Sequence, residues 1–412
     1  MKLSLQIAIR YLFAKKSQNI INIISWISVS GVLTGSLGLL VVLSVFNGLH
    51  GLIGSLYSSF DPDLKIEPLR GKVFSIDSLD YSSLVAIEGV DAITGVVEDH
   101  VLFRFGKRQV PGRIMGVDSL FNRVSSIDSI IVDGQFRLMY HGMYEGVMGY
   151  ALADQLGVRL NFVTPLMIYA PERTGRINPA RPDQSFRSRY LQPSGIYMVS
   201  QLDYDAAYTI THIDQARDLF DYDASTFSWM GIKIADGRKV ESVKQAVSKL
   251  LGNDFRVRNR EEQHETFFRM MKVEKLMAYL ILSFILLIAI FNVIGTLSML
   301  IFEKRESIGT LRSMGADRQL INRIFLFEGW LISLAGMAGG LLLGSLLVWL
   351  QQTFGFIRFH GAGNFVVDAY PVVLRWPDLV TVFVTVSLSG FLAAWYPVRV
   401  IVRRYFQELG DK

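Results

Sequence analysis

The sequence predicts an α-helical membrane protein with four transmembrane helices and a large α+β extracytoplasmic domain between the first two. Its four long apolar runs contain only one ionisable residue, Glu328. Each run can cross the ~30 Å hydrocarbon core as a helix that rises ~1.5 Å per residue. About 230 residues separate the first two runs, which is enough for a folded domain. The runs occupy residues 20–46, 276–302, 324–350 and 379–398.

Basic residues are concentrated in short segments beside the predicted spans. Segments 1–19, 303–323 and 399–412 together hold thirteen basic and five acidic residues, whereas the insert 47–275 holds 27 basic and 29 acidic. Short loops rich in Lys and Arg remain in the cytoplasm. We therefore expect both termini and the 303–323 loop to be cytoplasmic, and the insert and the 351–378 loop to lie outside. The net charge of +5 indicates orientation in a membrane and not a nucleic-acid partner.

The N-terminal segment, residues 1–19, has the character of an interfacial helix. Leu3, Ile7 and Tyr11 alternate with basic residues, a pattern typical of a helix that lies along the inner leaflet. The run that follows is longer than the core of a signal peptide, and no small-residue cleavage site comes after it. We interpret it as an uncleaved anchor.

Helical stalks are expected at both ends of the insert. Apolar residues continue beyond the first span to Leu56, before Asp61 and Pro62 end the helix. On the return, residues 260–275 contain neither Gly nor Pro and are expected to run as one helix into the second span.

Between the stalks, strand-like and helix-like stretches alternate, which predicts an α+β domain with two sub-regions. The stretch 171–193 differs because it holds four Pro and five Arg. We expect a long exposed arm there, either a solvated loop or a docking element for an acidic partner. Strands are expected at residues 93–105, 110–117, 162–169, 195–200, 227–234 and 255–258, and helices at 151–156, 214–220 and 240–251.

The sequence lacks the common motifs for catalysis, phosphate binding and metal binding. Gly71-Lys72 is followed by Val and has no preceding Gly at the spacing of a phosphate-binding loop. The six His are scattered, and the chain has no Cys. We therefore expect no catalytic residue and no metal site, and any ATP used by the protein would be bound by another subunit.

A short amphipathic helix is predicted in the 303–323 loop. Ile308, Leu311 and Met314 fall on one face of it, and Gly315 is a C-terminal stop. Asp317 can then cap the helix that becomes the third span. The apolar face indicates either a seat in a partner protein or an ordinary loop that touches lipid headgroups.

Glycines repeat at every fourth position in the first and third spans. This spacing lets two helix backbones approach closely, so we interpret these glycines as positions of helix packing. They are Gly31 and Gly35 in the first span, and Gly336, Gly340 and Gly344 in the third.

Glu328, the acid inside the third span, has two interpretations. It is a proton-relay acid, or it lies near the inner headgroups and pairs with Arg323 or water. We favour the second interpretation, because it needs no further polar group in the spans.

Several motifs in chain order resemble the LolC/LolE permeases of lipoprotein-releasing complexes, within the wider group that includes FtsX and MacB. The motifs cover both membrane halves and one part of the insert, and the resemblance is weak in the first half of the insert. They are Ile24-Ser-Trp-Ile-Ser-Val-Ser-Gly, Leu43-Ser-Val-Phe-Asn-Gly, Gly149-Tyr-Ala-Leu-Ala-Asp-Gln-Leu-Gly-Val, Met271-Lys-Val-Glu-Lys, Phe291-Asn-Val-Ile, Glu303-Lys-Arg-Glu-Ser-Ile-Gly-Thr-Leu-Arg-Ser-Met-Gly-Ala and Trp395-Tyr-Pro.

The resemblance implies a type VII ABC transporter-like architecture. The chain would be a non-catalytic permease subunit of the bacterial inner membrane, with a periplasmic α+β domain. A second permease, identical or paralogous, and a separate ATPase that binds ATP and Mg²⁺ would complete the complex. The complex would extract lipoproteins from the membrane lipid and hand them to a periplasmic carrier chaperone.

The resemblance also implies roles for two segments. The helix in the 303–323 loop would be the coupling helix seated in the ATPase, and the arm would dock the carrier. The arm is longer and more basic than in the family, which makes its contact pattern an open point. The coupling residues would be Glu306, Ile308, Leu311, Arg312, Met314 and Gly315, and the arm residues Arg173, Arg176, Pro179 and Arg181.

Three other functions fit parts of the pattern. An FtsX-like mechanotransmission permease would regulate a periplasmic enzyme or sensor, but its insert is typically smaller. A MacB-type efflux permease usually carries a fused ATPase, whereas only 19 residues precede the first span here. An ion-coupled transporter would need buried acids or broken helices in its spans. The lipoprotein-releasing function is therefore the first hypothesis.

Overall fold

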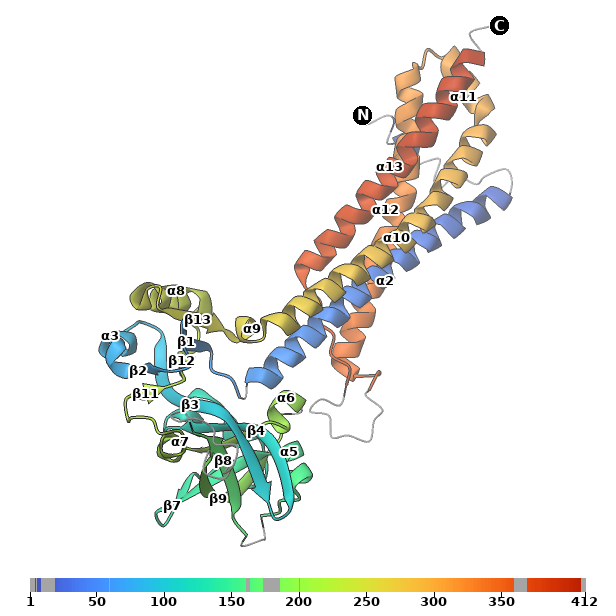
Figure 1. Cartoon of the computed structure of the whole chain (residues 1–412). Coiled ribbons are helices and arrows are strands. Elements are labelled where there is room, and N and C mark those ends of the chain that lie inside the picture. The colour runs from blue at the N-terminus through green and yellow to red at the C-terminus, as the bar shows by residue number, and fades with distance from the viewer. Residues whose placement is uncertain are drawn as a thin grey trace. The chain divides into compact units, whose positions relative to one another are not determined.

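The chain folds into two compact units, which we call the helical unit (residues 1–51 and 269–412) and the α+β unit (residues 52–268). Figure 1 shows both in the computed structural model. The structure describes residues 4, 6–8, 19–58, 60–160, 164–172, 186–199, 201–358 and 369–408. Most of the predicted interfacial helix, residues 1–19, lies outside these ranges.

Long helices build the helical unit, and in the described residues four of them are long and apolar enough to cross a membrane. The first contains 40 residues, or roughly 60 Å of helix, which is about twice the hydrocarbon thickness. Helices continue past the apolar run, as predicted for the first stalk. They are α2 (Asn19–Ser58), α10 (Glu265–Glu303), α12 (Arg318–Phe354) and α13 (Trp376–Glu408), with the short α11 (Arg305–Ser313) between α10 and α12.

The α+β unit is built on one large mixed sheet with short helices. Its strands are β1 (Leu64–Pro68), β2 (Phe74–Ser75), β3 (Val90–Phe105), β4 (Arg108–Val117), β5 (Ile131–Gly134), β6 (Met139–Tyr140), β7 (Met143–Gly149), β8 (Leu166–Pro171), β9 (Phe186–Tyr197), β10 (Tyr208–His212), β11 (Thr226–Phe227), β12 (Trp229–Ile234) and β13 (Phe255–Asn259). Its α-helices are α3 (Tyr81–Val85), α4 (Phe121–Val124), α5 (Tyr150–Leu156), α6 (Leu202–Asp205), α7 (Ile213–Phe220), α8 (Val240–Leu251) and α9 (Arg260–Gln263), with 3₁₀ turns at Ile76–Ser78 and Ile127–Ile130.

The main sheet has the strand order β13-β1-β12-β3-β4-β10-β7-β9-β5, and β8 pairs with both β3 and β9. The long strand β3 joins two halves of this sheet. Residues 90–96 pair with β12, whereas residues 96–105 pair with β4. One strand thus belongs to two neighbouring parts of the unit (Figure 1).

Two hydrophobic cores correspond to these two halves. The first gathers Leu64, Ile66 and Met230 with Val243 and residues of α3 and α8. The second gathers side chains of β3, β4, β8 and α7, and Phe103 at its centre is fully buried. Phe74 and Ile76 pack against both cores, and residues 52–268 form one compact unit, so the two sub-regions stay a prediction.

The predicted arm is shorter than expected. Strands β8 and β9 pair antiparallel from Leu166↔Leu191 to Pro171↔Phe186, so residues 186–193 are strand and not loop. The arm is therefore the connection of a β-hairpin. Its strand character was hidden in the sequence by Arg, Ser and Gln at the exposed positions of β9.

The prediction of an unbroken helix over 260–275 is wrong at one point. A capping box at Asn259 and Glu262 starts α9, which ends after four residues with His264 as its C-cap. The His264 Nε2 atom lies 2.7 Å from Asp61 Oδ2, and the Tyr204 hydroxyl donates to Asp61 Oδ1 at 2.8 Å. These contacts hold the His264 side chain within the α+β unit, and α10 begins at the next residue.

Candidate functional site

Helix α11, the predicted coupling helix, connects α10 to α12. Gly315 adopts a left-handed conformation (φ 92°), which a residue with a Cβ rarely takes, and so ends the helix. Its N–H donates to Arg312 O at 2.9 Å, and Ala316 N–H donates to Leu311 O at 3.0 Å. Asp317 then accepts from Leu320 N–H at 2.8 Å and caps α12. The connection is therefore a defined helix–turn–helix.

The predicted apolar face of α11 is divided between two environments. Ile308 is 2 % exposed and packs in a cluster with Ile321, Phe325 and Val398. Met314, just after the helix, is 80 % exposed, and Leu311 is half-buried. The expectation that Ile308 faces a partner is thus corrected, because this side chain fixes α11 to its own helical unit.

The remaining coupling candidates stay accessible. Glu306 and Arg312 are exposed on α11, and the terminal Met314 lies beside them in the chain. The exposed surface therefore combines an acid, a base and a flexible apolar side chain. Such a surface can bind a groove that offers both polar and apolar contacts.

The glycine repeats lie where helices contact each other. A Cβ at Gly340 would be 2.5 Å from the carbonyl oxygen of Leu33, and one at Gly336 would be 2.7 Å from that of Val29. Gly344 is less tightly enclosed, since a Cβ there would be 3.2 Å from Leu40 Cδ2 and 3.6 Å from Leu37 Cα. These three glycines let α12 contact the backbone of α2 directly.

The glycines of the first span contact a different helix. A Cβ at Gly35 would be 2.7 Å from Leu286 Cδ1, and one at Gly31 would be 3.5 Å from Ala289 Cβ. Both neighbours belong to α10, so α2 lies between α10 and α12. The two repeats therefore place α2 at the centre of the helix packing.

A buried polar cluster joins three helices, and we call Asn47, Lys275 and Asp378 the polar clasp. Asn47 Nδ2 donates to Asp378 Oδ2, while Lys275 Nζ contacts Asn47 Oδ1 at 2.8 Å and Asp378 Oδ1 at 3.2 Å. Asn47 is 3 % and Asp378 8 % exposed. The three residues come from α2, α10 and α13, so the cluster connects the interior of α2 and α10 to the start of α13. Sequence reasoning missed the polar clasp because its members are more than 100 residues apart.

The acid in the third span is buried. Glu328 is 0 % exposed and lies in α12 next to Gly329, which packs against Ala394 of α13. The structure therefore buries this side chain, while its depth in the membrane and its pairing with Arg323 or water stay predictions. The side chain belongs to the interior of the helical unit.

The four predicted arm residues, Arg173, Arg176, Pro179 and Arg181, lie outside the described residues. The two other arginines of the stretch lie on β9 and form ion pairs with α7 and the residue that follows it. Arg187 Nη1 is 2.9 Å from Asp221 Oδ1, and Arg189 pairs with both carboxylate oxygens of Asp218. The Arg189 hydrogen bond holds the pKa of Asp218 below its usual value. These two arginines fasten β9 to the α7 end and are separate from the hairpin connection.

Among the described residues, no group of three His, Asp or Glu is arranged to hold a metal ion. The polar clusters of the chain instead consist of ion pairs and hydrogen bonds. In the described residues, the polar clasp named above connects helices to one another, and α11 keeps Glu306, Arg312 and Met314 exposed.

The chain is similar in sequence to several known permeases. Residues 279–406, which cover α11 and the last two spans, match the family described as FtsX-like permease C-terminal. The lipoprotein-releasing system transmembrane protein LolC of Neisseria meningitidis serogroup B is 27% identical over 95% of this chain and 95% of its own length. LolC of Haemophilus influenzae is 25% identical over 96% of this chain and 95% of its own, and LolE of the same species is 22% identical over 94% of each. Among solved structures, the periplasmic region of MacB from Actinobacillus actinomycetemcomitans is 12% identical, covers 52% of this chain and 95% of that chain, and has a TM-score of 0.35.

The protein is thus a multi-pass membrane permease with four spanning helices among its described residues, an α+β unit inserted between the first two, and an FtsX-like segment at residues 279–406. Its similarity extends along nearly the whole chain and not only the membrane half. It is a permease of the LolC/LolE type, as its motifs predict.

Proposed function

We propose that this chain is the permease subunit of an inner-membrane ABC complex that extracts lipoproteins and passes them to a periplasmic carrier chaperone. The observation that carries the proposal is the end-to-end similarity to LolC and LolE proteins, which are named for lipoprotein release. A separate ATPase subunit binds ATP and Mg²⁺, and a second permease, a copy or a paralogue, completes the complex. In this proposal both termini and α11 are cytoplasmic, and the α+β unit is periplasmic, since the basic segments flank the spans on that side.

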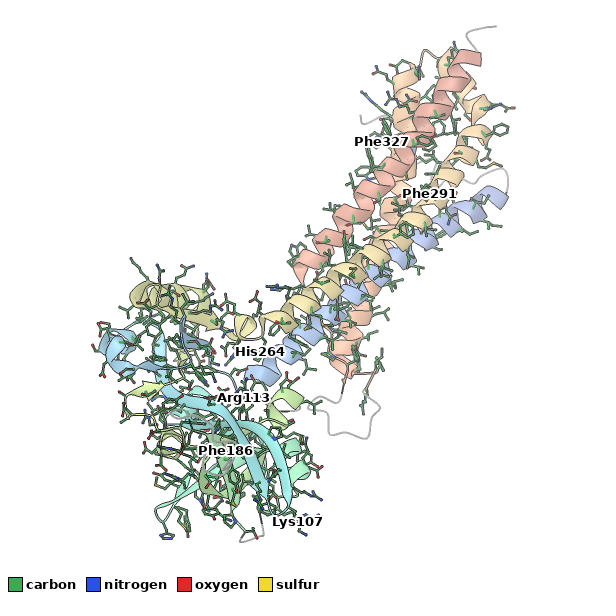
Figure 2. All side chains as sticks on the ribbon, viewed as in Figure 1. Lys107, Arg113, Phe186, His264, Phe291 and Phe327 are labelled. Atoms are coloured by element: carbon green, nitrogen blue, oxygen red, sulfur yellow. The ribbon has the colours of Figure 1, made fainter. Side chains whose placement is uncertain are left out.

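Energetics favour a membrane-embedded extraction path. A lipoprotein with three acyl chains buries on the order of 40 CH₂ groups, and at ~0.8 kcal/mol each this amounts to ~30 kcal/mol. No single conformational change could release such chains into water. The chains must therefore stay in apolar surroundings until a hydrophobic carrier takes them. The exposed apolar residues of α10 offer such a surface, among them Phe284 and Phe291, which is labelled in Figure 2.

The proposed ATPase contact is the accessible part of α11. Met314 and Leu311 supply the apolar contact, and Glu306 and Arg312 supply polar contacts around it. Ile308 anchors the helix to the cluster with Ile321 and Phe325. A displacement of α11 by the ATPase would therefore move α12 and α13 as well. Gly315 sets the direction in which α12 leaves.

Replacing Met314 with Asp is expected to abolish co-purification of the ATPase subunit from detergent-solubilised membranes. The exposed thioether would be exchanged for a charge that loses its solvation in a partner groove. Met314→Leu, which keeps an apolar side chain of similar volume, is the matched control and should retain the ATPase. Because Met314 is 80 % exposed in the chain, its replacement should leave the melting temperature of the purified permease unchanged. Undiminished recovery of the ATPase with Met314→Asp would remove α11 from the proposed interface.

The proposed carrier contact is the connection between β8 and β9. It holds Arg173, Arg176, Pro179 and Arg181, and the strands that precede and follow it in the chain pair antiparallel. A basic connection of this kind suits a carrier with an acidic surface.

Serine at positions 173, 176 and 181 is expected to weaken carrier binding at least tenfold and to leave ATPase activity unchanged. The loss should shrink at high salt, because exposed charges act through screened electrostatics. Arg187→Ser is the matched control, since Arg187 is already paired with Asp221. Surface plasmon resonance with the purified carrier measures the affinity of the triple variant and of the control. Equal affinity of the triple variant and the unaltered protein would assign the arm to a solvated loop.

A mechanotransmission permease that regulates a periplasmic enzyme or sensor is the second candidate. The match of residues 279–406 to FtsX-like permeases favours this second candidate. That match covers membrane helices and their connections, and so leaves open what the α+β unit does. Mass spectrometry of the purified complex separates the two. Acylated lipoproteins are expected for lipoprotein release, whereas a cell-wall hydrolase or sensor without lipoproteins would establish the alternative.

A further inference from the structure

One face of the main sheet in the α+β unit carries a set of polar side chains, whereas the other face packs into the hydrophobic cores. Direct pairing across strands puts Lys65 opposite Gly231, Trp229 opposite Val96 and His100 opposite Arg113. Since paired residues share a face and alternate residues along a strand do too, a set of polar side chains crosses five strands on one side. We call this set the polar stripe: Lys65 and Glu67 of β1, Trp229 of β12, Glu98 and His100 of β3, Arg113 of β4, and Tyr208 of β10.

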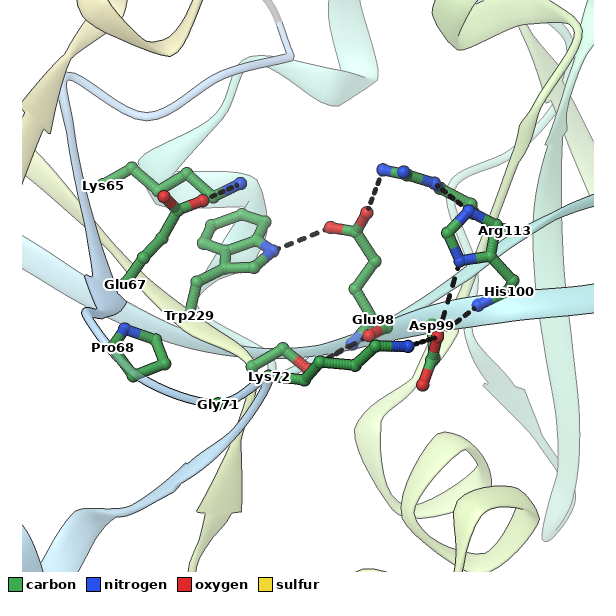
Figure 3. A pocket seen from close by; sticks show the side chains of 11 residues that line it. Lys65, Glu67, Pro68, Gly71, Lys72, Glu98, Asp99, His100, Arg113 and Trp229 are labelled. Carbon is green, nitrogen blue, oxygen red and sulfur yellow. Dashed lines mark hydrogen bonds and ion pairs between the residues drawn. The ribbon is translucent and has the colours of Figure 1, made fainter. Parts of the chain in front are cut away.

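All members of the polar stripe except Tyr208 line a cleft of about 310 Å³ in the α+β unit (Figure 3). This volume is at the lower end of the range for small-molecule sites. Pro68, Gly71 and Lys72 form the wall on the β1 side, and Lys72 Nζ reaches across to Asp99 Oδ1 at 3.3 Å. The Lys72 side chain is 77 % exposed, so this contact is weak and can open.

The acceptors in the cleft are already occupied. Glu98 Oε1 accepts from Arg113 Nη1 at 3.0 Å and from the Tyr208 hydroxyl at 2.9 Å, and Glu98 Oε2 accepts from Trp229 Nε1 at 2.8 Å. Burial and the Glu98 charge raise the pKa of the Tyr208 phenol, which keeps it a donor. Glu67 is paired with Lys65 and Arg258. The carboxylates therefore have little capacity left for a ligand.

Donors, in contrast, are in excess. Arg113 uses Nε for His100 and Nη1 for Glu98 and Tyr208, while its Nη2 donates to no described residue. The Lys65 ammonium lies 3.0 Å from Glu67 and 4.5 Å above the centre of the Trp229 ring, with its side chain 21 % exposed. The Lys65 ammonium has lost much of its hydration, and polar or anionic groups must replace the lost hydrogen bonds. The cleft thus presents unused donors and positive charge beside an aromatic ring.

We propose that this cleft binds a ligand that carries a single carboxylate, of amino-acid or short-peptide size, held between Arg113 and Lys65. The guanidinium edge of Arg113 matches a planar carboxylate, and Lys65 adds a second charge-assisted hydrogen bond. A phosphate fits less well, because its second negative charge would lie next to Glu67, Glu98 and Asp99. Trp229, which is 5 % exposed, lines the floor of the cleft beneath Lys65 and lies close enough to report on a bound ligand. The site is independent of lipoprotein release.

Binding should depend on pH through Lys65. Burial lowers the pKa of the Lys65 ammonium, although Glu98 and Asp61 act in the opposite direction. A bound carboxylate stabilises the charged form and raises this pKa. Affinity is therefore expected to fall as the pH rises through the pKa of the ligand-free protein.

Trp229 provides a direct readout, because it is the only Trp in residues 52–268. The full-length protein, labelled with 5-fluorotryptophan and purified in detergent, gives a ¹⁹F signal for Trp229 that Trp229→Phe assigns. A saturable shift of this signal is expected with N-acetylglycine, and none with N-acetylglycinamide, which differs only in its missing charge. An amidated peptide with one internal Glu tests whether the carboxylate comes from a protein segment. A shift with neither carboxylate probe, or an equal shift with the amide or with inorganic phosphate, would overturn the proposal.

Variants place the ligand within the cleft. Arg113→Gln and Lys65→Met are each expected to weaken binding at least tenfold, and Lys72→Met, at the mouth, about threefold, the loss expected for an exposed charge. Lys107→Met is the matched control, because Lys107 lies in the turn between β3 and β4, away from Arg113 (Figure 2). If Arg113→Gln or Lys65→Met lowers the melting temperature, its weaker binding also reflects lost stability. Lys72→Met then tests the site, because Lys72 is largely exposed and its replacement should leave the fold intact. Unchanged affinity in Lys72→Met and in a folded Arg113→Gln would refute the site.

Discussion

Replacing Gly340 with Ala is expected to destabilise the helical unit by about 1–3 kcal/mol, the cost typical of an overpacked interior. The new Cβ would lie 2.5 Å from the carbonyl oxygen of Leu33 and 2.7 Å from Ser36 Cβ. The carbonyl belongs to the backbone of α2 and cannot rotate away. The two helices would have to separate, which also loosens the contacts of Gly336 and Gly344. Thermal unfolding of the purified protein in detergent measures the loss.

Gly339→Ala is the matched control, one residue away on the same helix. Its Cβ would lie 3.0 Å from Leu33 Cδ1, the end of a flexible side chain that can move. We expect a much smaller effect, in keeping with the intrinsic gain of Ala over Gly in a helix. Equal melting temperatures for both variants would show that α2 and α12 do not contact each other through the glycine face.

Replacing Asp378 with Leu is the second change with a large expected effect, about 3 kcal/mol of lost stability, because it leaves the other members of a buried polar cluster without their acceptor. Lys275 would keep only its contact with Asn47, and Asn47 would lose the acceptor of its Nδ2 group. Since the polar clasp joins α2, α10 and α13, its loss should loosen the packing of these three helices around it. Thermal unfolding and the protection of the helix segments around Asn47, Lys275 and Asp378 from hydrogen exchange measure the effect.

The double variant Asp378→Leu with Lys275→Met tests the reason for this loss. If the cost comes from a cation left without its partner, removing the cation as well should restore part of the stability. The opposite result is that adding Lys275→Met lowers the stability of Asp378→Leu by as much as it lowers that of the unaltered protein. In that case the two side chains act independently.

The sequence was sufficient for the features that depend on local pattern. Span length, the stop at Gly315, the cap at Asp317 and helix α8 at Val240–Leu251 follow from hydrophobic periodicity and turn residues, and the structure shows each of them. Repeated glycines likewise indicate contact surfaces, because few other reasons place Gly at every fourth position of a span.

Features that depend on distant partners could not be predicted. Strands β7 and β10 are short, and β7 carries two of its own glycines, so neither has a clear alternating pattern. Ile308 belongs by pattern to an exposed face, but Ile321 and Phe325 of α12 bury it. The polar stripe is equally hidden, since Lys65, Glu98, Arg113 and Trp229 meet only when four strands pair in register.

The contact between Asp61 and His264 has a consequence for how such a chain can evolve. These residues are 203 positions apart, and yet each is within a few residues of where the chain enters or leaves the α+β unit. The unit thus begins and ends at one place, which is the condition for a module that can be inserted into a host chain without disturbing it. Natural variation could exchange, enlarge or shorten the whole module while the membrane helices keep their packing. One transmembrane framework could in this way acquire different external specificities by changing only what lies between these two residues.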